Sequence, residues 1–102
     1  MKLIIKVVLL VFLIQELFSG QNDYVQIFKT ILMKYNINYD QLDKYKAGAL
    51  CIPIQNKSYN NYAVGFSYKM YDKNYASSVA LKGCKEMKKK EISYECKCEK
   101  IL

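Results

Sequence analysis

The four cysteines constrain the fold of this chain more than any other feature. They are Cys51, Cys84, Cys96 and Cys98, and none lies in the apolar stretch that opens the sequence. An even number of cysteines in a small chain predicts two disulfides, formed in an oxidising compartment. Because a chain of this length buries little apolar surface, such crosslinks would supply a large share of its stability.

Residues 72–102 hold three of these cysteines and predict an amphipathic helix followed by a strand. Asp72 or Asn74 can cap the helix, since either side chain accepts hydrogen bonds from first-turn N–H groups. From Tyr94 to Glu99 the side chains alternate in character, with the cysteines on one side. Small and apolar residues recur at helical spacing on one helix face, namely Ala76, Val79, Ala80, Gly83, Cys84 and Met87.

The pairing of the cysteines is predicted by counting residues back along the helix and forward along the strand that follows it. With the helix ending near Lys90, Cys84 lies roughly 9 Å back along its axis. With the strand counted from Ser93, Cys96 lies roughly 10 Å forward. The matching lengths favour Cys84–Cys96, which leaves Cys51–Cys98. Four cysteines allow three pairings, and the sequence does not select among them.

Residues 1–20 have the layout of a secretory signal peptide. Lys2 precedes a run at residues 3–14 that is apolar apart from Lys6, and a more polar end follows. The run is shorter than the ~20 residues of a comfortable membrane span. We therefore expect cleavage near Gly20 and a secreted or periplasmic protein. The alternative is an uncleaved anchor, the one case in which we expect a tether to a membrane.

The rest of the chain predicts an α+β fold. Residues 21–45 form an N-terminal helical segment, because apolar residues recur there at i, i+3, i+4 and i+7. Residues 46–102 form a compact β-β-α-β domain with a small antiparallel sheet and two disulfides. Its first strand is expected at residues 46–54, where Pro53 places it at an edge or ends it. The second strand, at residues 62–70, pairs with the first as a hairpin.

The two faces of the first strand leave an alternative open. If Cys51 meets Cys98, then Ala49 and Cys51 face the C-terminal helix, and Leu50, Ile52 and Ile54 need cover from the N-terminal helix. If those three face the C-terminal helix instead, Cys51 points away from it and the preferred disulfide pairing fails. We favour the first arrangement, because small helix residues suit small sheet residues and both apolar faces are covered.

Residues 47–98 resemble a group of small exported bacterial domains of unknown function. That group combines a G-A-x-A-like strand, a Y-x-x-G-x-S-Y-like strand, an A-x-x-x-A-L-x-x-C helix and a final strand that opens with cysteine. The resemblance implies no catalytic residues, and it does not cover residues 21–45, Cys51 or Cys98. The matching residues are Gly48, Ala49, Tyr62–Tyr68, Ala76, Ala80, Leu81, Cys84 and Cys96.

The chain is basic, and its lysines have two interpretations. The chain has 16 basic and 9 acidic residues, and removal of residues 1–20 leaves 14 and 8, a net charge of +6. A solvated helix face is the simpler interpretation of the lysines in the C-terminal helix. The functional interpretation is contact with a protein or with an anionic glycan or lipid surface, whereas nucleic acid is an improbable partner for an exported chain. The lysines concerned are Lys82, Lys85, Lys88, Lys89 and Lys90.

Ten tyrosines add a second candidate surface. They can fill a thin core as half-buried side chains, or form a binding face, since tyrosine combines a rigid ring with a polar tip. Around the predicted hairpin and helix entry we expect Tyr59, Tyr62, Tyr68, Tyr71 and Tyr75 to gather.

Other chemistry finds less support. The cysteines could form a four-thiolate zinc site, but they lack the paired C-x2-C spacing, so we expect no metal and no cofactor. The chain has no histidine and no nucleophile motif, and we expect no enzyme activity. Asn56 begins a glycosylation sequon that would matter only in a eukaryotic secretory pathway. The sequence thus predicts an exported binding module, with a secreted enzyme inhibitor or toxin-like effector as the alternative.

Overall fold

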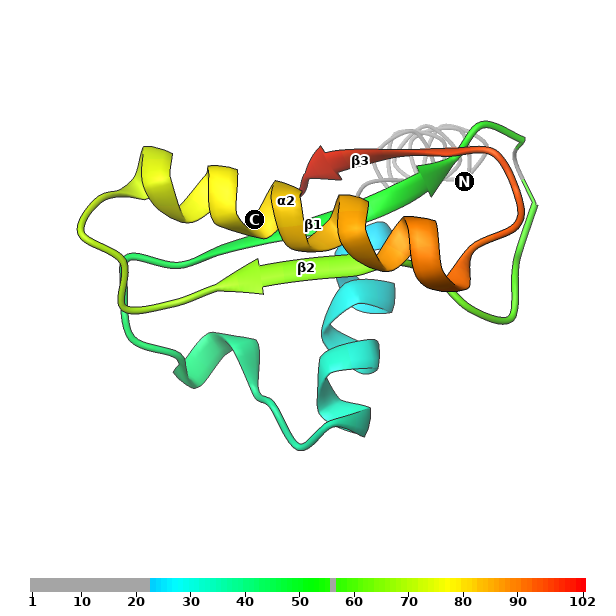
Figure 1. The fold of residues 1–102 in the computed structure, drawn as a ribbon. Coiled ribbons are helices and arrows are strands. Elements are labelled where there is room, and N and C mark those ends of the chain that lie inside the picture. The colour runs from blue at the N-terminus through cyan, green and yellow to red at the C-terminus, as the bar shows by residue number, and fades with distance from the viewer. Residues whose placement is uncertain (1–22, 56) are drawn as a thin grey trace, which may run out of the picture.

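The computed structural model describes residues 23–55 and 57–102, and shows a mixed α/β structure (Figure 1). Residues 23–34 are helical, and a short 3-10 helix, η1, spans Tyr39–Gln41. The strands are β1 (Ala47–Pro53), β2 (Val64–Ser67) and β3 (Cys96–Lys100), and the long helix α2 spans Lys73–Glu91. The predicted signal peptide, the predicted helix start at residue 21 and the sequon asparagine Asn56 lie outside the described residues.

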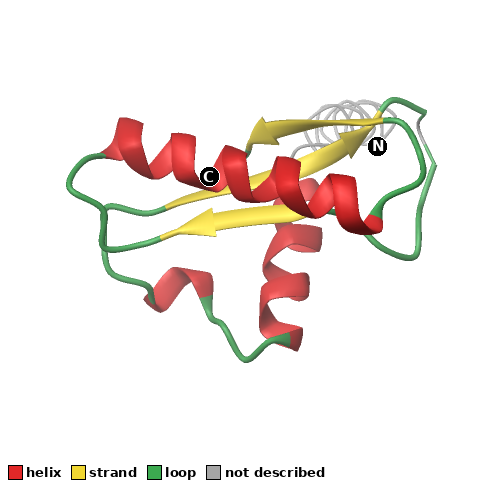
Figure 2. Ribbon diagram, in the orientation of Figure 1, coloured by secondary structure: helices red, strands yellow, loops and turns green. Residues whose placement is uncertain are grey.

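The three strands form one antiparallel sheet in the order β2-β1-β3 (Figure 2). The predicted hairpin pairing of β1 with β2 is confirmed, although β2 is shorter than expected. Pro53 ends β1, as one of the two predictions had it, but the predicted edge position is wrong because β1 is central. Cys51 donates its N–H to Ala63 on the β2 side. An N–H donor at position 53 would face the same side but would lie beyond Val64, where β2 begins, so Pro53 breaks no ladder bond there.

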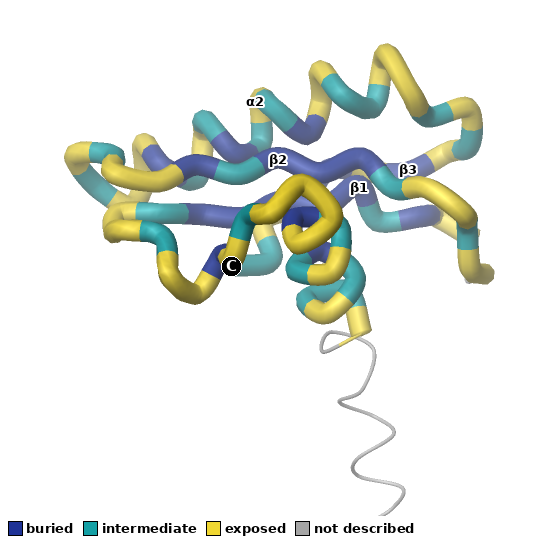
Figure 3. Tube along the Cα trace, turned by 90° about the horizontal axis from the view of Figure 1, so that it is seen from below, coloured by how far each residue is buried: buried dark blue, intermediate teal, exposed yellow. Residues whose placement is uncertain are grey.

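The sheet lies between two helical layers. Figure 3 shows α2 on one side and the helical segment 23–34 on the other. Along β1, Ala49 and Cys51 pack toward α2, whereas Leu50 and Ile52 pack toward residues 23–34. This confirms the favoured arrangement of the two faces. Ile54 is the exception: it is 70% exposed, because it follows the last residue of β1 and neither helix covers it.

Helix α2 begins at the predicted cap. The Asp72 carboxylate accepts a hydrogen bond from the Tyr75 N–H at 2.7 Å, which satisfies a first-turn donor. The helix buries Ala76, Ala80 and Cys84 against the sheet. Close approach depends on Gly65 in β2, where a Cβ atom would overlap the backbone of Ala80 and Cys84. As predicted, the small residues of α2 therefore pack closely against the sheet.

The opposite face of the sheet is covered by large side chains. Phe28, Leu32 and Leu50 are fully buried, with Tyr39 and Val64 beside them. The Phe28 ring meets the Tyr39 ring edge to face, with their centroids 5.4 Å apart. Hydrophobic burial, without a crosslink among these residues, fastens the helical segment 23–34 to the sheet.

Two disulfides are present, but the favoured pairing was wrong. The bonds are Cys51–Cys96 and Cys84–Cys98, with Cα atoms 5.3 and 6.0 Å apart. The helix ends at Glu91 and β3 starts only at Cys96, so the turn between them is longer than predicted. The Lys88 ammonium donates to the Cys96 carbonyl at 2.7 Å, which sets Cys96 beside Lys88, one turn beyond Cys84. Two strand residues span roughly the same distance as one helical turn, so Cys98 meets Cys84.

Candidate functional site

The clearest candidate surface is a row of three lysines, which we call the lysine ridge: Lys82, Lys85 and Lys89. All three are exposed. Their spacing of three and four residues places them on one face of α2 over roughly 10 Å of helix. That face lies opposite the buried Ala80 and Cys84, so the ridge forms the outer surface of a helix anchored by a disulfide.

The other two lysines of the predicted group, Lys88 and Lys90, do not belong to the ridge. Lys88 is half-buried and bonds to the Cys96 carbonyl, so it ties α2 to β3. Lys90 is exposed but follows Lys89 directly, which turns it about 100° around the helix axis from its neighbour. The structure therefore separates the predicted group of five into a ridge of three, one structural lysine and one lysine to the side.

The ridge ammonium groups are free to meet a partner. In residues 23–55 and 57–102 the ion pairs are Lys29–Asp40, Lys69–Asp43 and Lys97–Glu99, and none includes a ridge lysine. The chain has no arginine, so its cations are compact point charges without the planar fork that recognises one carboxylate in two-point fashion. Such a surface suits a diffuse anionic partner.

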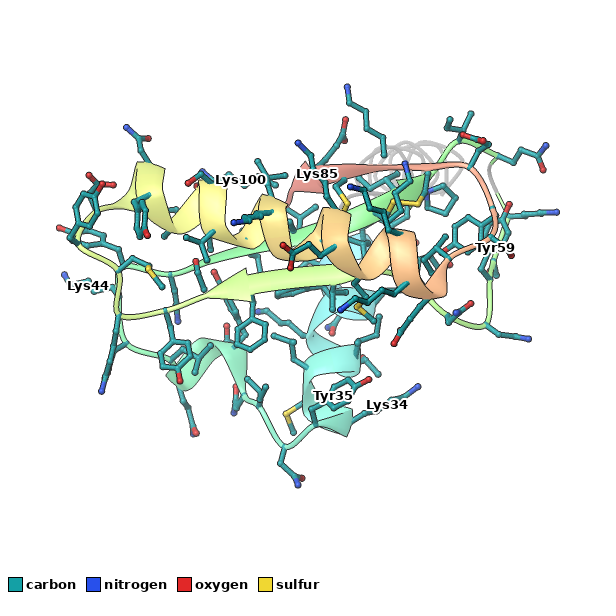
Figure 4. All side chains as sticks on the ribbon, in the orientation of Figure 1. Lys34, Tyr35, Lys44, Tyr59, Lys85 and Lys100 are labelled. Atoms are coloured by element: carbon teal, nitrogen blue, oxygen red, sulfur yellow. A yellow bond between two sulfur atoms is a disulfide. The ribbon has the colours of Figure 1, made fainter. Side chains whose placement is uncertain are left out.

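More positive charge lies at the start of α2. Lys73 donates to the Lys46 carbonyl, and its pKa is lowered by burial and then by the nearby ammonium groups of Lys100 and Lys46. Lys46 itself donates to the Tyr39 carbonyl at 2.9 Å. Figure 4 places Lys100 along the same margin of α2 and β3 as Lys85. Lys73 and Lys100 therefore add positive charge near α2, whereas the Lys46 ammonium lies beside Tyr39 and Asp40.

The tyrosines predicted to gather in one place divide into two groups. Tyr59, Tyr62 and Tyr94 pack together, with the rings of Tyr59 and Tyr94 stacked at 3.7 Å. The Tyr94 hydroxyl donates to the Asn61 carbonyl at 2.7 Å, and burial, then Tyr62 and Tyr59, raises its pKa to about 12. These rings are half-buried and fasten the loop before β2, so they are structural.

The second group is exposed, and we call it the tyrosine tip: Tyr45, Tyr68, Tyr71 and Tyr75. The backbones of Tyr45 and Met70 bond to each other, which brings the two segments side by side at one end of the molecule. The rings of Tyr71 and Tyr75 stack with centroids 4.7 Å apart. The four side chains are 45%, 44%, 75% and 43% exposed, in the order of the sequence. The sequence predicted tyrosines here, but not their separation from Tyr59 and Tyr62.

A groove of about 410 Å³ lies between the helical segment 23–34, the loop before β2 and the end of α2. Sequence reasoning did not find it, because its walls come from segments far apart in the chain. Its walls combine apolar side chains with uncharged polar ones, and Lys34 and Glu91 are its charged residues. The lining residues are Gln26, Ile27, Thr30, Ile31, Lys34, Tyr35, Asn60, Asn61, Tyr62, Met87 and Glu91.

Neither a metal-binding cluster nor a free thiol is found among residues 23–55 and 57–102. All four cysteines are joined in disulfides, so the four-thiolate zinc site weighed from the sequence is not formed. Among residues 23–55 and 57–102 no group of His, Cys, Asp or Glu side chains is arranged to hold a metal ion. In the same residues no helix has the length and apolar character needed to cross a membrane.

Comparison with known proteins found no match among family models, curated proteins or solved structures. The resemblance of residues 47–98 to small exported bacterial domains therefore stays a prediction.

Proposed function

We propose that this protein is an exported, non-enzymatic binding module that contacts an anionic partner through the lysine ridge. One observation carries the proposal. Lys82, Lys85 and Lys89 stand exposed on successive turns of a helix, and no described carboxylate pairs with them. Several like charges held in a fixed row attract a polyanion at longer range than a single flexible side chain does.

The disulfides support two parts of the proposal, a rigid lysine ridge and export to an oxidising environment. Cys84 lies between Lys82 and Lys85 and is bonded to β3 through Cys98, so the ridge is held at its centre. Two disulfides indicate an oxidising environment, extracellular or periplasmic. Export through cleavage near Gly20 is part of the proposal, and it would leave the mature chain with its net charge of +6.

The proposal is tested by retention on immobilised heparin, used as a generic polyanion. Replacing all three ridge lysines, as Lys82→Gln, Lys85→Gln and Lys89→Gln, should weaken binding on the order of a hundredfold, at ~1 kcal/mol per lysine near a charged surface. Added salt should weaken wild-type binding, because exposed charges are screened within about 8 Å at physiological ionic strength.

A matched control changes the same amount of charge elsewhere. Lys34, Lys57 and Lys97 are exposed and lie off the ridge. Their triple change to glutamine should reduce retention much less than the ridge variant does. Equal losses in the two variants would show that only net charge matters and would refute a defined ridge.

A further inference from the structure

We propose that the tyrosine tip, together with the lysine ridge, docks this protein on the surface of a bilayer that contains anionic phospholipids. The inference rests on the proposed function for its electrostatic part, and it adds the identity of the partner. Its basis is the juxtaposition of an exposed aromatic cluster and a row of cations on one helix.

The tip is an ordered feature. Tyr45 exchanges two backbone hydrogen bonds with Met70, at 3.0 and 3.4 Å, and Lys69 donates its N–H to the Asp43 carbonyl at 3.1 Å. Tyr75 belongs to the first turn of α2, capped by Asp72. The rings are therefore presented from a fixed frame, which reduces the entropy lost when they meet a surface.

The composition of the tip suits a membrane interface. A tyrosine ring is apolar while its hydroxyl is polar, so the side chain favours the headgroup level of a bilayer, between water and hydrocarbon. The stacked rings of Tyr71 and Tyr75 make an exposed apolar patch of the kind that marks an interaction site, and Tyr45 and Tyr68 are exposed at the same end of the molecule. Tyr71, at 75%, is the most exposed of the four.

Tyr75, on which the Tyr71 ring stacks, lies on the same surface as the ridge. Tyr75, Ser78, Lys82, Lys85 and Lys89 follow each other at steps of three and four residues, and all are exposed. They therefore share the outer face of α2 over roughly 21 Å. A helix resting on a bilayer would set the rings at the interface near its start and the ammonium groups over the headgroups toward its end.

The charge of the tip agrees with this orientation. Lys44, Lys69 and Lys73 are exposed there, whereas Asp43 pairs with Lys69 at 3.8 Å and Asp72 is occupied as the helix cap. Peripheral proteins bind membranes stably when two weak signals combine, commonly an apolar element and a basic patch. A soluble polyanion would engage the lysines alone and give the exposed rings no role, which is why the observations favour the bilayer.

The test is flotation with vesicles of equimolar phosphatidylcholine and phosphatidylglycerol, compared with phosphatidylcholine alone. Wild-type protein should float with the anionic vesicles and far less with the neutral ones. The double variant Tyr71→Ser, Tyr75→Ser should lose about tenfold in partition coefficient while keeping its retention on heparin. The control Met33→Ser, Tyr35→Ser removes two other exposed apolar side chains, carried by the helix on the opposite side of the sheet, and should float like wild type.

Because the chain has no tryptophan, the fluorescence of a single introduced tryptophan reports contact of its position with the bilayer. The emission of Tyr71→Trp should shift to shorter wavelength with anionic vesicles, whereas that of Tyr35→Trp should not. An unshifted Tyr71→Trp, or full flotation of the Tyr71/Tyr75 double variant, would overturn the inference. Wild-type protein that binds heparin but no vesicle would overturn it in favour of a protein or glycan partner, leaving the proposed function intact; failure on both supports would refute both.

Discussion

The two sides of the sheet are held by different means. On the α2 side the core consists of alanines and cystines, with Gly65 allowing the backbones of β2 and α2 to touch. On the other side Phe28, Leu32 and Leu50 are fully buried, and none of the disulfides lies among them. Small side chains bury little area each, so the first side depends on close fit and crosslinks, and the second on hydrophobic burial.

The comparison also bears on function. The lysine ridge and Tyr75 of the tyrosine tip both belong to α2, the helix on the crosslinked side. A clamped helix holds its outer face in one position, which suits a surface built to meet a partner. The following predictions test how far the two sides differ.

The largest effect is expected at Gly65. Gly65→Val should destabilise the protein by about 4 kcal/mol or more, because its side chain would overlap the backbone of Ala80 and Cys84, which cannot move aside while a disulfide holds the helix. Urea unfolding followed by circular dichroism measures the loss.

Gly83→Ala is the matched control on the facing helix. A Cβ atom there would lie 3.5 Å from the Gly65 Cα, an ordinary contact. Alanine is the better helix former, so this variant should gain about 0.5–1 kcal/mol. A tolerated Gly65→Val would contradict the close approach of α2 to β2.

Removal of the disulfides ranks next. Loss of Cys51–Cys96, which spans 45 residues, should cost about 4 kcal/mol, and loss of Cys84–Cys98, which spans 14, about 3 kcal/mol. Each pair is replaced by two alanines, and thermal unfolding is compared. Because Cys84–Cys98 fastens α2 itself, its loss should also weaken retention on heparin, whereas a variant that keeps full retention would show that the ridge needs no clamp.

A smaller effect is expected on the uncrosslinked side, at Gly48. A Cβ atom at this position would lie 2.6 Å from the Phe28 ring, so Gly48→Ala should cost about 2 kcal/mol. The Phe28 ring that Gly48 meets can be changed by mutation, whereas the backbone that Gly65 meets cannot. In a Phe28→Leu background the same change should cost at least about 1 kcal/mol less, a coupling measurable by a double-mutant cycle. Additive effects would show that Phe28 does not pack on Gly48.

The smallest effect concerns Tyr94, a partly buried side chain that packs against the core on the α2 side. Its folded-state pKa is raised to about 12 by burial and then by Tyr62 and Tyr59, from 10.0. The neutral phenol is thus favoured by folding, and this contribution is complete below pH 10 and lost as the pH rises through about 12. Unfolding by urea across that window should show a steeper loss for wild type than for Tyr94→Phe, with Tyr71→Phe behaving like wild type; identical slopes for wild type and Tyr94→Phe would contradict the contribution.

Local patterns in the sequence predicted what local physics decides. The Asp72 cap, the small face of α2 and the alternation of buried cysteines with exposed Lys97 and Glu99 were all readable from spacing. The assignment of Cys51 and Leu50 to opposite faces also followed from a period of two. The start of the N-terminal helix lies outside the described residues.

Longer-range features could not be read in the same way. The disulfide pairing depends on the length of the turn at residues 92–95, and a difference of two residues exchanges Cys96 for Cys98 opposite Cys84. The separation of Tyr59 from Tyr71 depends on which loop reaches which end of α2. The groove beside Met87 needs three distant segments to meet. Each of these is decided by tertiary packing, which spacing along the chain does not encode.

The most direct test of the clamp is a non-reducing peptide map after digestion with a protease that cleaves after lysine. Lys97 lies between Cys96 and Cys98, so digestion places these two cysteines in separate peptides. The structure predicts that peptide 47–57 is linked to 91–97 and that peptide 83–85 is linked to 98–100. A link between 83–85 and 91–97, or four free thiols in the folded protein, would contradict the account.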